Sequence, residues 1–354
     1  MKTILITGSA GLVGSACVRL FHDRGWKVVG IDNNQRLKFF GAGASTRPIA
    51  DALMRDLPNY EHHPIDLRAH LEVLNLFRVT LPDAVVHAAA QPAHEWGERL
   101  PADNWAHNVT ATLNVLEAAR HNCPEAPFIF MSTSKVYGSI VNTLPMHEAE
   151  TRFEYIEPRD GLNEEIEVDR SAHTQYGASK LAADILVQDY GRSFNMQTVC
   201  LRLGCVTGAN HQGVPMHGFL SNLVKTLRRG DPYTIHGYKG KQVRDQLHAK
   251  DVAFACELVI ARGVPFVGAV YNLGGRQANS ISILEAIKEV SQRLEGSPVG
   301  MIDPVIFEED EPRYADQIIV VNDTRRFAYV SIAWRPTPLD KILDELVEAE
   351  LARA

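Results

Sequence analysis

Short apolar runs alternate with longer amphipathic segments through the first part of the chain. The runs that indicate buried strands cover residues 4–7, 27–32, 83–88, 128–131 and 198–202. Between them, apolar side chains recur every three or four residues, which is the spacing of one helix face, in segments 13–25, 67–80, 104–121 and 176–194. Strands that alternate with helices predict an α/β fold built on a doubly wound parallel sheet.

The pattern changes after about residue 205, where loops rich in Gly, Pro and His follow. Helical periodicity returns at residues 219–229, 251–261 and 283–294, with a closing amphipathic helix at 341–354. We therefore predict two lobes. Residues 1–204 form the doubly wound domain, and residues 205–354 form mainly a smaller C-terminal α/β substrate lobe, with some segments that return to the first domain.

Composition and charge limit the partners. The 354 residues are 45% apolar, which is enough for a sizeable core, and the net charge of −7 argues against a nucleic-acid surface. No apolar run reaches the ~20 residues of a membrane span, and the opening segment is too short and too weakly charged for a signal peptide. We expect a soluble, cytoplasmic protein with no nucleic-acid or membrane partner.

Cysteine, histidine and acidic residues add little chemistry by their spacing. The five cysteines form no C-x-x-C pair, so we expect reduced thiols packed in apolar segments. The histidines lack the i, i+4 spacing of a helical zinc site, and no metal is predicted. Residues 148–170 carry nine acidic and three basic side chains, which we interpret as a solvated surface segment.

A glycine-rich turn joins the first predicted strand to the first predicted helix. Gly8, Gly11 and Gly14 keep side chains away from the helix N-terminus, whose free N–H groups and positive partial charge can bind a diphosphate. Asp32 ends the next strand, where its carboxylate can accept hydrogen bonds from the ribose hydroxyls of an adenosine. Because Asp32 would repel a 2′-phosphate and is followed by Asn33 instead of an arginine, NAD is favoured over NADP.

The G-x-x-G-x-x-G spacing resembles that of the extended short-chain dehydrogenase/reductase superfamily, whose members have a Rossmann-like fold. The resemblance covers most of the chain and continues at Asp66-Leu67, at the strand end 87–90, and at Asn108 in a helix that supports the superfamily's active site. The cofactor contacts that it implies are Gly8, Gly11, Leu12, Val13, Gly14, Asp32, Asn33, Asp66, Leu67, Ala88, Ala89, Ala90, Asn108, Tyr176 and Lys180.

Hydride transfer from a carbinol needs a base for the hydroxyl proton. Tyr176 and Lys180 stand at i and i+4 of a predicted helix, so that the ammonium group can stabilise the phenolate near neutral pH. The segment 131–138 resembles the superfamily's strand that carries the catalytic Ser or Thr three residues before Val-Tyr-Gly, and this register selects Thr133. We predict a catalytic triad of Thr133, Tyr176 and Lys180.

The residues after Thr133 restrict the class of reaction that the triad can catalyse. In sugar-nucleotide 4,6-dehydratases the pair Asp-Glu follows this Thr and eliminates water, whereas Ser134 and Lys135 stand here. Typical UDP-galactose 4-epimerases carry Asn at the position of Cys205, which disfavours that branch. The stretches that resemble CDP-paratose 2-epimerases are residues 133–138, 240–249, 271–275 and 279–282, whereas residues 91–96 depart from their pattern.

A nucleotide-sugar substrate would bring a diphosphate, which needs local cations in an acidic protein. Arg244 and Arg313 are the candidates, and Arg313 is in the register of the superfamily's late diphosphate-binding arginine. The further candidates for contacts to the substrate are Gln91, His94, Thr133, Lys135 and His217.

The resemblance and the triad together predict an NAD-dependent nucleotide-sugar epimerase, which oxidises a carbinol transiently and returns the hydride to the opposite face. Its favoured substrate is CDP-paratose, inverted at C2 to give CDP-tyvelose. The open alternatives are a UDP-hexose or UDP-hexuronate 4-epimerase, a dehydrogenase with net oxidation, and a non-catalytic NAD-binding regulatory protein. Relatives pair through helices like those predicted at 104–121 and 176–194, which implies a homodimer.

Overall fold

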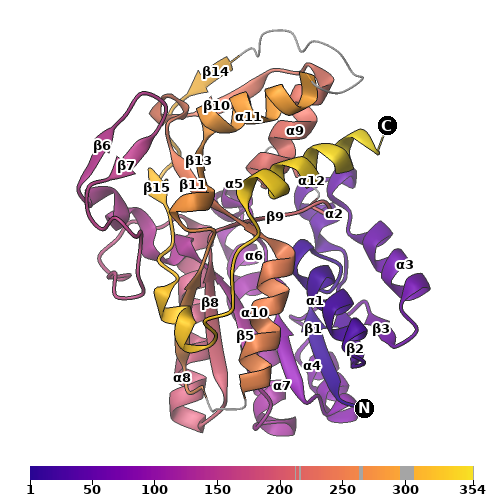
Figure 1. Cartoon of the computed structure of the whole chain (residues 1–354). Helices are drawn as coiled ribbons and strands as arrows, with labels where there is room; N and C mark the ends of the chain where they lie inside the picture. Colours follow the sequence, from indigo (N-terminus) through magenta and orange to yellow (C-terminus); the bar gives the residue numbers. More distant parts are fainter. Residues whose placement is uncertain (212, 215–216, 263–265, 296–306, 354) are drawn as a thin grey trace.

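A parallel sheet of seven strands runs through the centre of the molecule, with helices on both of its faces (Figure 1). The computed structural model describes residues 1–211, 213–214, 217–262, 266–295 and 307–353. In spatial order the strands are β12 (Ala269–Leu273), β8 (Thr198–Leu203), β5 (Phe128–Thr133), β4 (Ala84–His87), β1 (Thr3–Thr7), β2 (Lys27–Ile31) and β3 (Tyr60–His63). The predicted Rossmann-like α/β fold is confirmed, and strand order reverses between β1 and β4.

The central strands are apolar throughout because helices cover both faces of the sheet. Ile4 and Ile6 of β1 share one core with α1 (Leu12–Asp23) and α10 (Ala249–Arg262). Leu5, which points the other way, shares a second core with α4, α7 and α8. The bounds of these three helices are His70–Thr80, Ala111–Asn122 and Gln175–Phe194.

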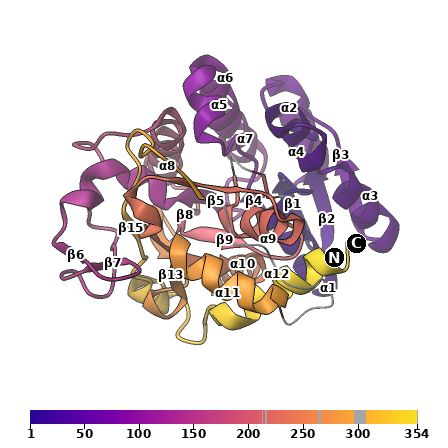
Figure 2. The ribbon, with the colours of Figure 1, turned by 90° about the horizontal axis from the view of Figure 1, so that it is seen from above.

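A second lobe covers the carboxyl ends of the strands and lies at the top of Figure 1. Three helices share its core: α9 (Phe219–Arg229), α11 (Ile283–Glu295) and α12 (Leu339–Leu351). Its strands are β9 (Cys205–Thr207), β10 (Tyr233–His236), β11 (Val243–His248), β13 (Ser280–Ser282), β14 (Phe307–Asp310) and β15 (Ile319–Val320). In Figure 2, α12 and α11 lie side by side along the edge of this lobe.

Short elements complete the chain. They are α2 (Gln35–Phe40), η1 (Ala42–Ala44), α3 (Arg47–Asp56), α5 (His94–Arg99), α6 (Pro101–Trp105), η2 (Ala106–Thr110), η3 (Ser134–Thr143), β6 (Met146–Glu148), β7 (Phe153–Tyr155), η4 (Tyr238–Gly240), η5 (Gln277–Asn279) and η6 (Arg325–Tyr329). The closing helix begins at Leu339, two residues before its predicted start, and Ala354 lies outside the described residues.

The helix predicted over 104–121 is not uniform. A turn of π-helix, η2, separates α6 from α7 and carries Asn108 on its inner side, where the side chain is buried. Single π-helical turns inside α-helices are frequent at functional sites. Periodicity of apolar positions does not reveal this turn.

Most acidic side chains of segment 148–170 are exposed, which agrees with its interpretation as a solvated surface segment, but the segment is also attached to the rest of the molecule at several points. Its β6–β7 hairpin is fixed by ion pairs of Arg152 with Glu285 at 2.6 Å and of Lys241 with Glu148 at 2.7 Å. Leu162 is fully buried, and its backbone N–H donates to the carbonyl of Val321 at 2.7 Å. Long-range contacts therefore attach this segment to the second lobe.

All five cysteines are free thiols, as predicted. No helix in the described part of the chain combines the length and the apolar character that crossing a bilayer requires. Among the same residues, no group of three or more His, Cys, Asp or Glu side chains is placed to bind a metal ion.

Candidate functional site

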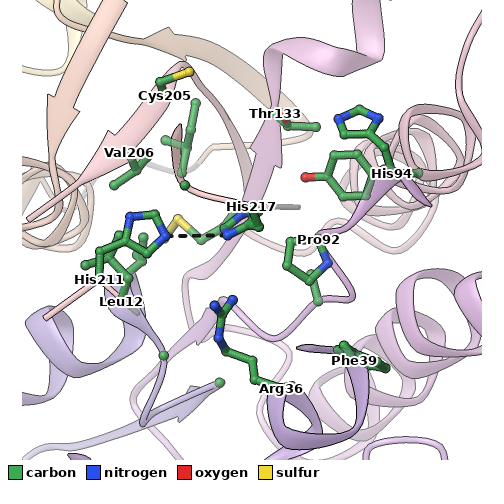
Figure 3. A pocket seen from close by; sticks show the side chains of 18 of the residues that line it. Leu12, Arg36, Phe39, Pro92, His94, Thr133, Cys205, Val206, His211 and His217 are labelled. Carbon is green, nitrogen blue, oxygen red and sulfur yellow. Dashed lines mark hydrogen bonds between the residues drawn. The ribbon is translucent and has the colours of Figure 1, made fainter. Parts of the chain in front are cut away.

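A cleft of about 840 Å³ opens at the carboxyl edge of the central sheet and is lined by residues of both lobes. Its position outside the ends of β1 and β4 is where ligands bind in open α/β sheets, and its volume suits a cofactor together with a small substrate. Figure 3 shows Thr133 and His94 on one side of this cleft, with Leu12 and His211 on the opposite side.

The glycine-rich turn forms the floor of the cleft beside α1. Gly8 has a φ of +65°, and its carbonyl accepts a hydrogen bond from the backbone N–H of Gly11 at 2.9 Å. A Cβ atom on Gly14 would lie 2.0 Å from the Gly8 oxygen, so only glycine permits this packing. The turn thus brings bare backbone to the start of α1 at Leu12, which fits the diphosphate of NAD.

Asp32 lies at the end of β2 and faces the same cleft. Its carboxylate accepts the backbone N–H groups of Ala10 at 3.1 Å and Asn34 at 2.8 Å, and the hydroxyl of Thr46 at 3.0 Å. These bonds fix the carboxylate beside the glycine-rich turn, where the ribose of an adenosine would lie. The residue set therefore fits NAD on both counts, the diphosphate and the ribose.

The three residues of the predicted triad line one cleft. Thr133 ends β5, and Tyr176 lies in the first turn of α8, which Thr174 caps by accepting the N–H of Gly177 at 3.1 Å. Lys180 follows one turn later on the same helix face. Strand β5 and the start of α8 therefore converge at the carboxyl edge of the sheet.

Burial controls the protonation of the Tyr176 phenol and the Lys180 amine. Burial raises the pKa of Tyr176 to about 12, although a hydrogen bond with Thr133 lowers it in part. Burial lowers the pKa of Lys180 to about 7, against the nearby negative charge of Asp184. The Lys180 ammonium donates to the carbonyl of Met131 at 2.7 Å and lies 4.0 Å from the centre of the Phe130 ring.

Two predicted contact residues, Gln91 and Asn108, lie behind the cleft and do not line it. The backbone N–H of Gln91 donates to the side-chain oxygen of Asn108 at 2.8 Å, and the Asn108 amide donates to the Ser179 hydroxyl at 2.9 Å. Asn108 therefore connects the loop after β4 to α8, next to Lys180. The Gln91 side chain is fully buried and its amide donates to the carbonyl of Ala93 at 2.9 Å, and its expected substrate contact stays a prediction.

The predicted substrate cations line the cleft but already have anionic partners. Asp316 accepts from Lys135 at 3.0 Å and from Arg244 at 3.1 Å. Burial alone would raise the pKa of Asp316, but these two cations lower it well below its usual range. Arg313 pairs with Glu95 at 3.0 Å across the cleft mouth, with both side chains about one-third exposed.

Every other residue predicted to contact cofactor or substrate lines the cleft. His94 lies against the Tyr176 ring in an edge-to-face contact with centroids 5.1 Å apart, and its Nδ1 is 2.9 Å from the Thr174 hydroxyl. Sequence reasoning missed Asp316 and Arg36 as cleft residues. Asp316 stands three residues after the predicted diphosphate contact Arg313, whereas no sequence signal marked Arg36.

The family model for the NAD dependent epimerase/dehydratase family matches residues 4–274. The chain is similar to the CDP-paratose 2-epimerase of Salmonella typhi, at 31% identity over 328 residues that cover 89% of this chain and 93% of that protein. It is also similar to the dTDP-glucose 4,6-dehydratase of Neisseria meningitidis, at 28% identity over 338 residues that cover 89% of this chain and 85% of the relative.

Solved structures share the fold. The UDP-glucose 4-epimerase of Thermus thermophilus in complex with NAD superposes with a TM-score of 0.77 at 23% identity, over 99% of this chain and 100% of that one. The UDP-glucuronic acid 4-epimerase of Bacillus cereus, in complex with UDP-glucuronic acid and NAD, gives a TM-score of 0.77 at 22% identity with the same coverage. The chain therefore belongs to the NAD dependent epimerase/dehydratase family and is an NAD-dependent enzyme of the nucleotide-sugar epimerase and dehydratase type.

Proposed function

We propose that this enzyme inverts C2 of CDP-paratose to give CDP-tyvelose, with Thr133, Tyr176 and Lys180 as its catalytic residues. The observation that carries the proposal is the convergence of these three side chains on the cleft that contains the glycine-rich turn. The sugar is favoured by the 31% identity to a CDP-paratose 2-epimerase over nearly the whole length of both chains.

Gly8, Gly11, Gly14 and Asp32 would hold NAD, which would supply the acceptor for the hydride from C2. The Tyr176 oxygen takes the proton of the C2 hydroxyl and later gives it back, so that the proton balance of a full turnover is zero. A protonated Lys180 on the same helix face favours the phenolate form of Tyr176. The Thr133 hydroxyl donates to the substrate oxygen and stabilises the ketone once it has formed.

The residues after Thr133 support epimerisation over dehydration. Ser134 is buried, and its hydroxyl donates to the carbonyl of Leu203 at 2.8 Å, so it faces away from the cleft. Lys135 is paired with Asp316. Asp316 is a carboxylate in the cleft, but because Lys135 and Arg244 lower its pKa, it stays ionised at neutral pH and is a poor proton donor.

The test is proton NMR of CDP-paratose incubated with the purified protein and no added NAD. Inversion at C2 places H-2 equatorial, so the large coupling between H-2 and the axial H-3 proton should become small. Because no NAD is added, turnover in this experiment would also mean that the purified protein retains its cofactor. An unchanged spectrum, with bound NAD confirmed by chromatography, would overturn the CDP-paratose assignment, and turnover of a UDP-hexose or UDP-hexuronate in its place would establish the 4-epimerase alternative.

A further inference from the structure

Two segments that are distant in the sequence meet above the glycine-rich turn. One is α2 of the first lobe, and the other is the stretch before α9, which carries His211 and His217. The Phe40 ring of α2 stacks on the His217 ring, with centroids 6.0 Å apart and an interplanar angle of 28°. We call Arg36, Phe40, His211 and His217 the cover.

Arg36 projects from α2 into the cleft. Its guanidinium group points toward His217 and lies between Leu12 on one side and Pro92 on the other (Figure 3). The guanidinium carbon lies 4.8 Å from the centre of the Phe40 ring, one turn along the same helix. Burial lowers the pKa of Arg36 to about 10, against the raising effect of Asp32, so the group remains a cation at neutral pH.

The two histidines of the cover are neutral donors beside this cation. Burial lowers the pKa of His217 to about 3, and the charge of Arg36 acts in the same direction. His211 is almost fully buried, its Nε2 lies 3.4 Å from Nδ1 of His217, and its Nδ1 has no hydrogen-bond partner among the described residues. The cover thus brings positive charge and imidazole nitrogens to the cleft above the positive end of α1, an arrangement that is complementary to an anion.

We propose that the cover is the outer half of the NAD diphosphate site, in which Arg36 donates to the diphosphate oxygens that face away from α1. A guanidinium fork matches phosphate oxygens, and the start of α1 at Leu12 supplies backbone N–H groups from the inner side. The proposal depends on the family's use of NAD and is independent of which sugar is bound.

This placement explains how the cofactor would stay bound between turnovers. NAD could leave only after Arg36 releases the diphosphate and the Phe40–His217 contact opens. An epimerase needs its NAD to stay bound, because the hydride removed from the substrate has to be returned to the opposite face of the same carbon. The second lobe therefore contributes to cofactor retention as well as to substrate binding.

The test compares nucleoside ligands that differ by the diphosphate. In the full-length chain stripped of NAD, Arg36→Gln should weaken ADP binding by about 10- to 100-fold, the range of one charge-assisted hydrogen-bond pair, and change adenosine binding less than about twofold. Lys38→Gln is the matched control, because this substitution removes the same charge from the same helix. The Lys38 side chain is half-exposed and pairs with Asp103 at 3.7 Å. His217→Ala should speed the exchange of bound NAD for isotopically labelled NAD.

Two results would overturn the proposal. If Arg36→Gln weakens the binding of adenosine as much as the binding of ADP, Arg36 supports the shape of the pocket and does not contact the diphosphate. If Arg36→Gln leaves ADP binding unchanged but weakens the binding of CDP to the NAD-loaded enzyme, Arg36 serves the substrate's diphosphate. Neither result depends on turnover of CDP-paratose, so a failure of the proposed function would appear separately.

Discussion

A graded series of Gly→Ala variants tests whether the glycine-rich turn is the NAD diphosphate site. A Cβ on Gly14 would lie 2.0 Å from the Gly8 oxygen, and one on Gly11 would lie 3.1 Å from the same atom, whereas Gly43 has open space around it. To regain an ordinary contact of 3.4 Å, the backbone must move by about 1.4 Å in Gly14→Ala but only by about 0.3 Å in Gly11→Ala. Gly43→Ala needs no movement.

In the variants without NAD, we expect the turn to open and relieve this overlap. Binding of the diphosphate requires the closed turn, so the free-energy cost of the overlap lowers the affinity for NAD. Overpacking against backbone costs about 1–3 kcal/mol, which corresponds to a loss of about 5- to 150-fold in NAD affinity for Gly14→Ala. Gly11→Ala should lose less, and Gly43→Ala should match the parent protein.

Isothermal titration of the NAD-stripped chains measures these affinities directly, and circular dichroism checks that each variant is folded. Equal NAD affinity of the Gly14→Ala and Gly43→Ala variants would refute the assignment of the turn. A larger loss for Gly11→Ala than for Gly14→Ala would refute the packing argument.

Three further predictions concern the active site and its support. Tyr176→Phe should retain bound NAD but lose at least about 10²-fold in kcat, and an unimpaired kcat would exclude Tyr176 as the base. Thr133→Val should shift the rise of kcat with pH to higher pH, because the hydrogen bond that lowers the pKa of Tyr176 is lost; a lower kcat with an unmoved profile would contradict this. Asp184→Ala should cost about 3–5 kcal/mol in urea unfolding, because it leaves Arg202 buried without the partner that it contacts at 3.0 Å, whereas exposed Asp189→Ala should be nearly neutral.

The fold was predictable where apolar pattern and local spacing determine structure. The runs at 4–7 and 128–131 lie within β1 and β5, and the helix predicted over 219–229 has the bounds of α9. Strand β12 was not predicted as a member of the central sheet. Its pairing with β8, for example Tyr271 beside Leu201, joins segments far apart in sequence, and a short apolar run does not specify such a partner.

The candidate site divides in the same way. The arrangement of the turn glycines, and of Tyr176 and Lys180 at i and i+4, could be predicted from their spacing in the sequence. The ionic partners of the cleft cations could not be predicted in this way, because Asp316 contacts Lys135 only when the two lobes are assembled. Gln91 could not be recognised as buried from sequence, since its position depends on the π-helical turn that contains Asn108.

The homodimer remains a prediction. Leu113 of α7 and Ile185 of α8 are exposed apolar side chains on the two helices through which pairing is expected. Light scattering of the purified protein would measure the mass, and a monomer of 39.3 kDa would exclude the dimer.

The most direct test of the central claim follows the hydride itself. CDP-paratose labelled with deuterium at C2 is incubated with the enzyme in ordinary water without added NAD, and the product is analysed by NMR and mass spectrometry. Transient oxidation with return of the same hydride predicts CDP-tyvelose that retains the deuterium at C2. Loss of the label to solvent would contradict hydride return, and recovery of unchanged CDP-paratose from the NAD-loaded enzyme would contradict the proposed substrate.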